Sequence, residues 1–224
     1  DLNGLIRQGA EVSIQKRVDA LGDTVAGLQE LITYGIKGAA AYAIHAHILG
    51  RDDDGIYALI HEILDFVAGE PTDVNALVGY GLKTGELNLK TMEILDAANT
   101  GTYGHPEPTQ VRVTPVKGKA ILISGHDIKD LEELLKQTAG KGINVYTHGE
   151  MLPCHAYPAL KKFKHLVANY GSAWQNQQRE FDEFPGAIVM TTNCLMKPKE
   201  SYKARVFTCG PVGFSGVTRI KGHD

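Results

Sequence analysis

Apolar residues recur three or four positions apart from Leu5 to about Asn99, the spacing of helices that bury one face. The pattern predicts four helices, over residues 4–20, 23–49, 53–69 and 73–98. Gly50, which precedes a run of aspartates, and Pro71 are typical of a helix end followed by a new helix start. Because the loops between these long helices are short, we predict an antiparallel helical bundle.

The pattern changes after Thr100 to Pro108, a segment rich in glycine and proline that reads as a linker. Beyond it, the spacing predicts strands over residues 120–123, 143–146, 166–168, 187–190 and 205–207. Helices are predicted between them, over 127–138, 155–163 and 172–183. Strands that alternate with helices indicate a parallel sheet. We therefore predict an α/β fold with a helical bundle domain over 1–105 and a Rossmann-like α/β domain over 106–224.

Composition narrows the function classes. Lys and Arg number 23 against 26 Asp and Glu, so no basic surface for nucleic acid is predicted. The longest weakly polar run, Gly35 to Gly50, is too short to span a membrane. Three cysteines argue against a disulfide framework, so we expect a cytoplasmic protein with a small-molecule or protein partner.

The chain opens on Asp1 and closes on 221–224 without a cap or strand pattern, so we expect a piece of a longer protein.

Polar side chains follow three of the predicted strands. His126 comes after the first strand, Glu150 after the second and Cys194 after the fourth. Ligands of open parallel sheets bind at the carboxyl ends of the strands, so we expect these side chains to meet at one edge. Nitrogen, oxygen and sulfur donors together suit a transition metal. The pattern leaves open a metal cluster and a single catalytic zinc with three protein ligands.

Each residue also has an ordinary structural interpretation. His126 could cap the helix over 127–138, and Glu150 could complement the positive N-terminus of a following helix. Cys194 could be a buried structural thiol. The spacing alone does not choose between these roles and metal binding.

Several longer strings resemble, in order, those of the hybrid cluster protein family, the hydroxylamine reductases or prismane proteins. In the α/β part they are Ile121–Asp127, Tyr146–Pro153, Asn169–Gly171 with Trp174–Gln177, and Met190–Cys194. In the helical part the matching string is Ile32–Ala43. The resemblance covers nearly the whole chain.

The resemblance implies specific roles. His126, Glu150 and Cys194 match metal ligands of the family's hybrid iron–sulfur–oxygen cluster, so they are expected to bind this cofactor. Glu150 is also a candidate catalytic residue, and Asn193 matches a position that lines the substrate cavity. The implied enzyme is a hydroxylamine reductase that converts hydroxylamine to ammonia and water, with nitric oxide as a further substrate, and takes its electrons from a redox donor.

The chain departs from the family in what it lacks. The family's N-terminal cysteine motif for a second, cubane iron–sulfur cluster does not occur here, so that cluster is not encoded in this chain. The remaining ligands of the hybrid cluster are expected from the other segments of the same enzyme. Cys154 and Cys209 match no ligand. His148 and His155 are candidates for supporting the ligands or relaying protons.

Two other functions stay open for the sequence. One is a mononuclear zinc hydrolase that uses His126, Glu150 and Cys194. The other is a non-catalytic folding fragment of the reductase, whose stability would not depend on metal.

Overall fold

The computed structural model describes residues 1–220. The closing residues 221–224, whose sequence shows no cap or strand pattern, lie outside the described part. The chain forms two compact units, one from Asp1 to Ala98 and the other from Asn99 onward. The two units are considered separately.

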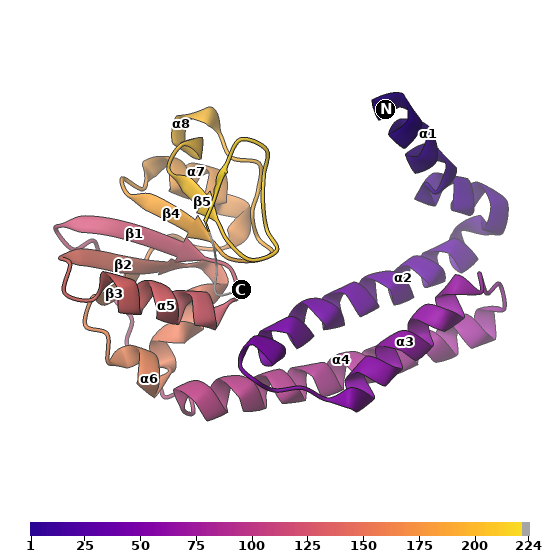
Figure 1. Ribbon diagram of the computed structural model, residues 1–224, viewed down its shortest axis with the longest axis horizontal. Helices are drawn as coiled ribbons and strands as arrows, with labels where there is room; N and C mark the ends of the chain where they lie inside the picture. The colour runs from indigo at the N-terminus through magenta and orange to yellow at the C-terminus, as the bar shows by residue number, and fades with distance from the viewer. Residues whose placement is uncertain (221–224) are drawn as a thin grey trace. The chain divides into compact units, whose positions relative to one another are not determined.

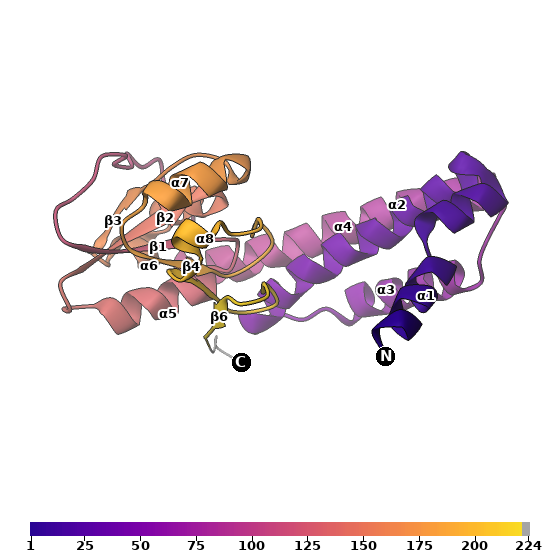
Figure 2. The same cartoon turned by 90° about the horizontal axis from the view of Figure 1, so that it is seen from above.

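The first unit is helical, as predicted. Its helices are α1 (Leu2–Glu11), α2 (Ile14–Ile48), α3 (Asp54–Ala68) and α4 (Val74–Tyr103), the last of which runs on beyond Ala98 (Figure 1). Helices α2, α3 and α4 lie side by side with alternating directions in both views (Figures 1 and 2). Their shared core consists of Ile32, Ile36, Ala39, Ile56, Leu59, Ile63, Leu77 and Leu87. The antiparallel bundle is therefore built from three helices, because α1 buries no residue.

Two helix boundaries differ from the prediction. The predicted helix over 4–20 is interrupted at Val12, and α2 starts anew because the Ser13 side chain accepts a hydrogen bond from the Lys16 amide. The predicted break near residue 22 is a bend inside α2, where Gly22 has a φ of 79°.

The predicted linker over 100–108 is wrong in its first residues. Helix α4 continues to Tyr103, whose ring is buried and packs edge-to-face on Tyr157 with the centroids 6.0 Å apart. This packing favours a helix where glycine content alone predicted a loop. The helix then ends at Gly104, which has a φ of 86°.

The second unit holds a parallel sheet, as predicted. Its strands are β1 (Lys119–Ser124), β2 (Ile143–His148), β3 (Leu166–Asn169), β4 (Ala187–Met190), β5 (Val206–Thr208) and β6 (Thr218–Arg219). Within the described residues they form one six-stranded sheet in the order β3-β2-β1-β4-β5-β6, and every neighbouring pair is parallel. This is the strand order of doubly wound dinucleotide-binding domains, in which the chain reverses direction across the sheet between β1 and β4.

Helices cover both faces of this sheet. Helix α5 (Ile128–Thr138) lies on one face, and α7 (Gln177–Glu183) lies on the other (Figure 2). The face beneath α7 and α8 (Glu200–Lys203) has a core of Leu122, Tyr146, Ala168, Phe181, Phe184, Ile188, Met190, Tyr202 and Val206. This core fixes the strand ends from which the candidate site extends.

The shorter helices correct two predictions. The predicted helix over 155–163 is the end of a 3-10 helix, η1 (Gly149–Ala156), followed by α6 (Pro158–Lys161). The break falls at Tyr157, which is extended because it precedes a proline. The predicted helix over 172–183 is a 3-10 turn, η2 (Trp174–Asn176), that leads into α7.

Candidate metal centre

The strand order explains why three loops distant in sequence meet. β2, β1 and β4 are neighbours, and their carboxyl ends carry Glu150, His126 and Cys194 respectively. His126 and Cys194 therefore stand on the two sides of the point where the chain reverses direction across the sheet. In open α/β sheets this is where ligands bind.

The loop after β1 is held against the loop after β4. The Thr191 amide donates to the Ser124 carbonyl at 3.0 Å, and the His126 amide donates to the Thr192 hydroxyl at 2.7 Å. Gly125 lies between these contacts with a φ of 121°. A β-carbon there would lie 2.7 Å from the Thr192 amide nitrogen and closer still to the Thr191 hydroxyl. Only glycine lets the two loops approach this closely.

Cys194 follows a tight turn. Asn193 has a φ of 57°, a conformation that asparagine tolerates better than most residues. The Cys194 amide donates to the Thr192 carbonyl at 2.9 Å, and the Leu195 amide donates to the Asn193 carbonyl at 3.0 Å. This compact backbone places the thiol beside the end of β1.

The three side chains offer ligand atoms that all lie within 4.8 Å of one another. Among residues 1–220 they are the one such group of at least three His, Cys, Asp or Glu side chains. His126 Nε2 contacts Glu150 Oε2, and the Asn193 amide nitrogen lies 3.4 Å from His126 Nδ1. The structure thus brings together all four residues singled out in the sequence. Their roles as ligands and catalytic groups stay a prediction.

The donor set fits a transition metal. Two ligands of one tetrahedral ion, at roughly 2.0–2.3 Å each, lie about 3.3–3.8 Å apart. The pair His126 and Glu150 would have to separate, and Cys194 would have to come closer, for one ion to reach all three. Burial, together with the negative charge of Glu150, raises the pKa of the Cys194 thiol. The thiol would therefore keep its proton at neutral pH until a cation displaced it. Imidazole, carboxylate and thiolate together are also compatible with an iron–sulfur–oxygen cluster.

The other candidate residues do not join this group. His148 is fully buried between Ser124 and Glu180, and His155 Nε2 lies 2.9 Å from the Thr147 hydroxyl. Burial raises the pKa of the Cys154 thiol to about 12.

Cys209 is also buried, and it donates to Asp130 Oδ2 at 3.2 Å. Neither Cys154 nor Cys209 belongs to the metal-ligand group.

Sequence reasoning missed the residues that hold the loops together. Thr191 and Thr192 lie within a string that the resemblance had marked, but their role in joining two loops depends on the sheet order. Gln177 is fully buried on α7 and hydrogen-bonds the backbone on both sides of Leu195. Gln177 also lies within a string that the resemblance had marked, but nothing there distinguishes it from the surface amides beside it.

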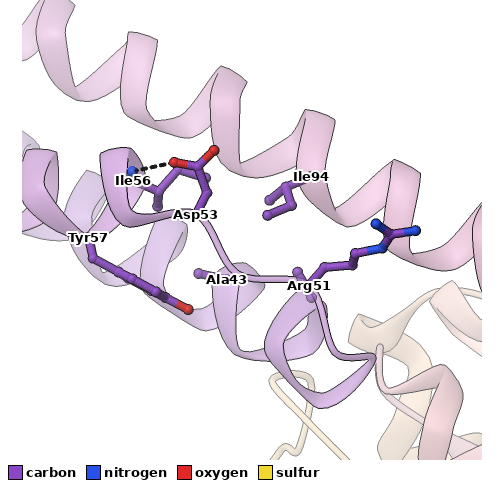
Figure 3. Close-up of a pocket in the computed structure, with 7 residues that line it drawn as sticks. Ala43, Arg51, Asp53, Ile56, Tyr57 and Ile94 are labelled. Carbon is purple, nitrogen blue, oxygen red and sulfur yellow. Dashed lines mark hydrogen bonds between the residues drawn. The ribbon is translucent and has the colours of Figure 1, made fainter.

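Two hollows in the helical unit offer no comparable chemistry. One is a shallow apolar depression beside the start of α3, where Asp53 caps the helix by accepting from the Ile56 amide (Figure 3). The other is a groove between α2 and α4 lined by glycine, leucine, tyrosine, threonine and asparagine side chains. No His, Cys or Glu lines either one. No helix in the described part of the chain combines the length and apolar character needed to cross a membrane.

Comparison with known proteins supports the motif resemblance. Residues 1–224 match the model of the Prismane/CO dehydrogenase family. A hydroxylamine reductase of Burkholderia lata is 56% identical over 224 residues, which are 100% of this chain and 40% of that protein. The hydroxylamine reductase of Syntrophobacter fumaroxidans is 54% identical over 223 residues, 100% of this chain and 41% of that protein. That of Thermodesulfovibrio yellowstonii is 55% identical over 224 residues, again 100% of this chain and 41% of that protein. The chain therefore spans about 40% of the length of these curated relatives.

Proposed function

Because the chain belongs to the Prismane/CO dehydrogenase family, we propose that His126, Glu150 and Cys194 are ligands of a hybrid iron–sulfur–oxygen cluster. The protein they serve is a hydroxylamine reductase. The observation that carries the proposal is the approach of three different donor atoms to within 4.8 Å at the carboxyl edge of the sheet. The remaining cluster ligands come from other segments of the same enzyme.

The reaction consumes hydroxylamine, two electrons and two protons, and it yields ammonia and water as the N–O bond breaks. When bound, the cluster supplies the electrons and a Lewis-acidic iron that weakens this bond. The electrons reach it from a separate redox donor. Nitric oxide is a second small substrate of the same class. The three cysteines are free thiols, which suits the reducing conditions of the cytoplasm.

With a cluster bound, Glu150 would be the ligand free to move aside for substrate. Its side chain is 57% exposed, whereas that of His126 is 15% exposed, so Glu150 can move without opening the core. Its carboxylate could then accept or deliver a proton beside bound substrate.

Asn193 orients the neighbouring imidazole. Its amide lies beside His126 Nδ1, the ring nitrogen that does not contact Glu150. The amide nitrogen only donates, so in this arrangement Nδ1 accepts and the ring proton lies on Nε2. With the amide turned over, its Oδ1 would accept from Nδ1–H and hold the ring in the tautomer that leaves Nε2 free for a metal. Its exposed face is available to bind substrate through the same amide.

The test of the proposal is Glu150→Gln in the anaerobically purified whole enzyme. Ammonia formation from hydroxylamine is measured with a reduced viologen dye as donor, together with iron content. We expect turnover to fall at least about tenfold, since a ligand that also moves protons is lost. Glu200→Gln, which changes an exposed glutamate on α8, should match the wild type. Unchanged iron content and turnover in Glu150→Gln would refute the proposed role.

A mononuclear zinc hydrolase is the second candidate, because imidazole, carboxylate and thiolate are all zinc ligands and these three lie within 4.8 Å of one another. It predicts one zinc per chain, no visible absorption and hydrolytic activity. Elemental analysis and the absorption spectrum of the wild-type protein separate it from the iron–sulfur enzyme.

A further inference from the structure

Helix α7 contacts the loop that carries Cys194 through one buried side chain. Gln177 is 0% exposed. Its Nε2 donates to the Cys194 carbonyl at 2.7 Å, and its Oε1 accepts from the Met196 amide at 2.9 Å. Two hydrogen bonds from one planar amide to two backbone groups fix the orientation of the loop as well as its position.

One turn further along the same helix, Glu180 reaches the ends of β1 and β2. Glu180 Oε2 lies 2.9 Å from His148 Nε2, and His148 Nδ1 lies 3.0 Å from the Ser124 hydroxyl. Ser124 stands two residues before His126, and His148 stands two residues before Glu150. A single chain of hydrogen bonds therefore joins α7 to the strand ends that carry the other two ligands.

The Glu180 carboxylate, which begins this series of hydrogen bonds, accepts further hydrogen bonds from Ser172. Ser172 donates to Glu180 twice, from its hydroxyl at 2.6 Å and from its amide at 3.1 Å. Burial alone would raise the pKa of Glu180, but the hydrogen bonds from Ser172 and His148 outweigh burial and hold that pKa below its usual value. The carboxylate is therefore ionised at neutral pH.

The backbone leaves no spare room around this pair. Gly171 has a φ of 72°, and a β-carbon there would lie 2.6 Å from Glu180 Oε2 and 2.9 Å from the His148 ring. Because Glu180 and His148 are packed this tightly against Gly171, their side chains have little freedom to move. The ends of β1 and β2, which they contact, are held in place with them. An apolar core that includes Phe181 already joins α7 to the sheet, so the buried polar contacts add a fixed orientation to that attachment.

We propose that Gln177 and Glu180 are positioning residues of the metal centre, through which α7 sets the relative placement of Cys194, His126 and Glu150. The inference rests on the proposed function of these three residues as ligands. Gln177 acts on the backbone of Cys194, and Glu180 acts through His148 and Ser124. Neither touches metal or substrate.

The first test compares Gln177→Glu and Gln177→Leu with the wild type. Gln177→Glu keeps the acceptor for Met196 and loses the donor to Cys194, whereas Gln177→Leu loses both. The neighbouring Gln178 donates to the Lys197 carbonyl at 2.8 Å, so Gln178→Ala is a matched control on the same helix and loop. Iron retention is measured in each protein by competition with EDTA, and the melting temperature is measured in parallel.

We expect half of the iron to be lost at roughly 10- to 100-fold lower EDTA concentration in Gln177→Leu, with a smaller change in Gln177→Glu. Gln178→Ala should retain iron like the wild type. If iron retention falls only in proportion to the melting temperature in all three variants, the positioning role is overturned, because the effect on iron is then one of general stability. Wild-type protein without iron would instead refute the proposed function.

The second test needs no metal. Alkylation of Cys194 by iodoacetamide is followed by mass spectrometry after the metal is removed, with the buried Cys154 and Cys209 as internal references. We expect faster alkylation of Cys194 in both Gln177 variants, at unchanged rates for the two references. Equal Cys194 rates in the wild type and the Gln177 variants would overturn the positioning role whatever the metal content.

Discussion

At the scale of single residues, the metal centre depends on close contacts between loops that follow different strands. Gly125 allows the loop after β1 to touch Thr191 and Thr192, and Asn193 allows the turn before Cys194. Gly125 has no side chain to separate the loops, and Asn193 tolerates a positive φ. Most other residues at these two positions would force the loops apart. Their substitution should therefore affect stability and metal retention together.

Gly125→Ala tests this contact. The new β-carbon would meet the Thr192 amide at 2.7 Å while the backbone keeps a φ of 121°, so we expect more than the about 1–3 kcal/mol of backbone strain alone. Gly140→Ala is the control, since Gly140 has a φ of 72° but nothing within 4 Å of a β-carbon. Urea unfolding should show a clearly larger loss for Gly125→Ala. Equal losses would mean that the two loops are not in contact.

The Glu180 pair predicts a pH dependence of stability. An unfolded glutamate has a pKa of about 4.3, and the folded pKa is lower because the hydrogen bonds from Ser172 and His148 outweigh burial. The stabilisation is therefore present above about pH 4.3 and is lost as the pH falls through the folded value.

We expect the melting temperature of Glu180→Gln to fall less steeply than that of the wild type below about pH 4.3. Glu183→Gln, which changes an exposed glutamate on the same helix, should keep the wild-type profile. Parallel profiles for the wild type and Glu180→Gln would contradict the assignment of an ionised, paired carboxylate.

Sequence analysis could identify the polar residues that follow the strands. It could not identify the residues whose hydrogen bonds hold two loops together. His126, Glu150 and Cys194 could be found because parallel strands place their carboxyl ends along one edge. Asn193 was singled out by the family resemblance alone. Gln177 could not be found, since its partners lie on a loop beyond another strand and its neighbours on α7 are also polar. Long-range hydrogen bonds leave no periodic signal in a sequence.

At the scale of elements, burial decides which helices stabilise the first unit. Helices α2, α3 and α4 share an apolar core, whereas α1 leaves Leu2, Leu5 and Ile6 exposed. The apolar spacing of α1 resembles that of the packed helices, so pattern alone predicted one continuous helix there. The cap at Ser13 and the extension of α4 to Tyr103 likewise reflect local hydrogen bonding and packing that override composition.

A pair of leucine substitutions tests this division. Leu77 on α4 is fully buried and Leu5 on α1 is 66% exposed. We expect Leu77→Ala to lower the free energy of unfolding by about 2–5 kcal/mol, because it leaves a cavity in the bundle core. Leu5→Ala should change it by less than about 0.5 kcal/mol. A comparable loss in both variants would show that α1 packs against the protein in solution.

At the scale of the whole molecule, the doubly wound sheet brings three candidate ligands together without any short metal-binding motif. The fold class and the family could be predicted, because several strings were in register over the chain. The chain spans about 40% of the length of its curated relatives, so a complete ligand set is to be sought in the whole enzyme. A folding fragment without metal dependence would instead melt cooperatively at the same temperature with and without EDTA.

The most direct measurement is the iron and zinc content, with the visible spectrum, of the anaerobically purified whole enzyme and its Cys194→Ala variant. We expect several irons per chain and broad visible absorption in the wild type, both lost or strongly reduced in Cys194→Ala. Cys154→Ala, which removes a buried thiol outside the ligand group, should retain both. One zinc per chain without visible absorption, or the same iron content in Cys194→Ala as in the wild type, would contradict the assignment of this site to an iron–sulfur cluster.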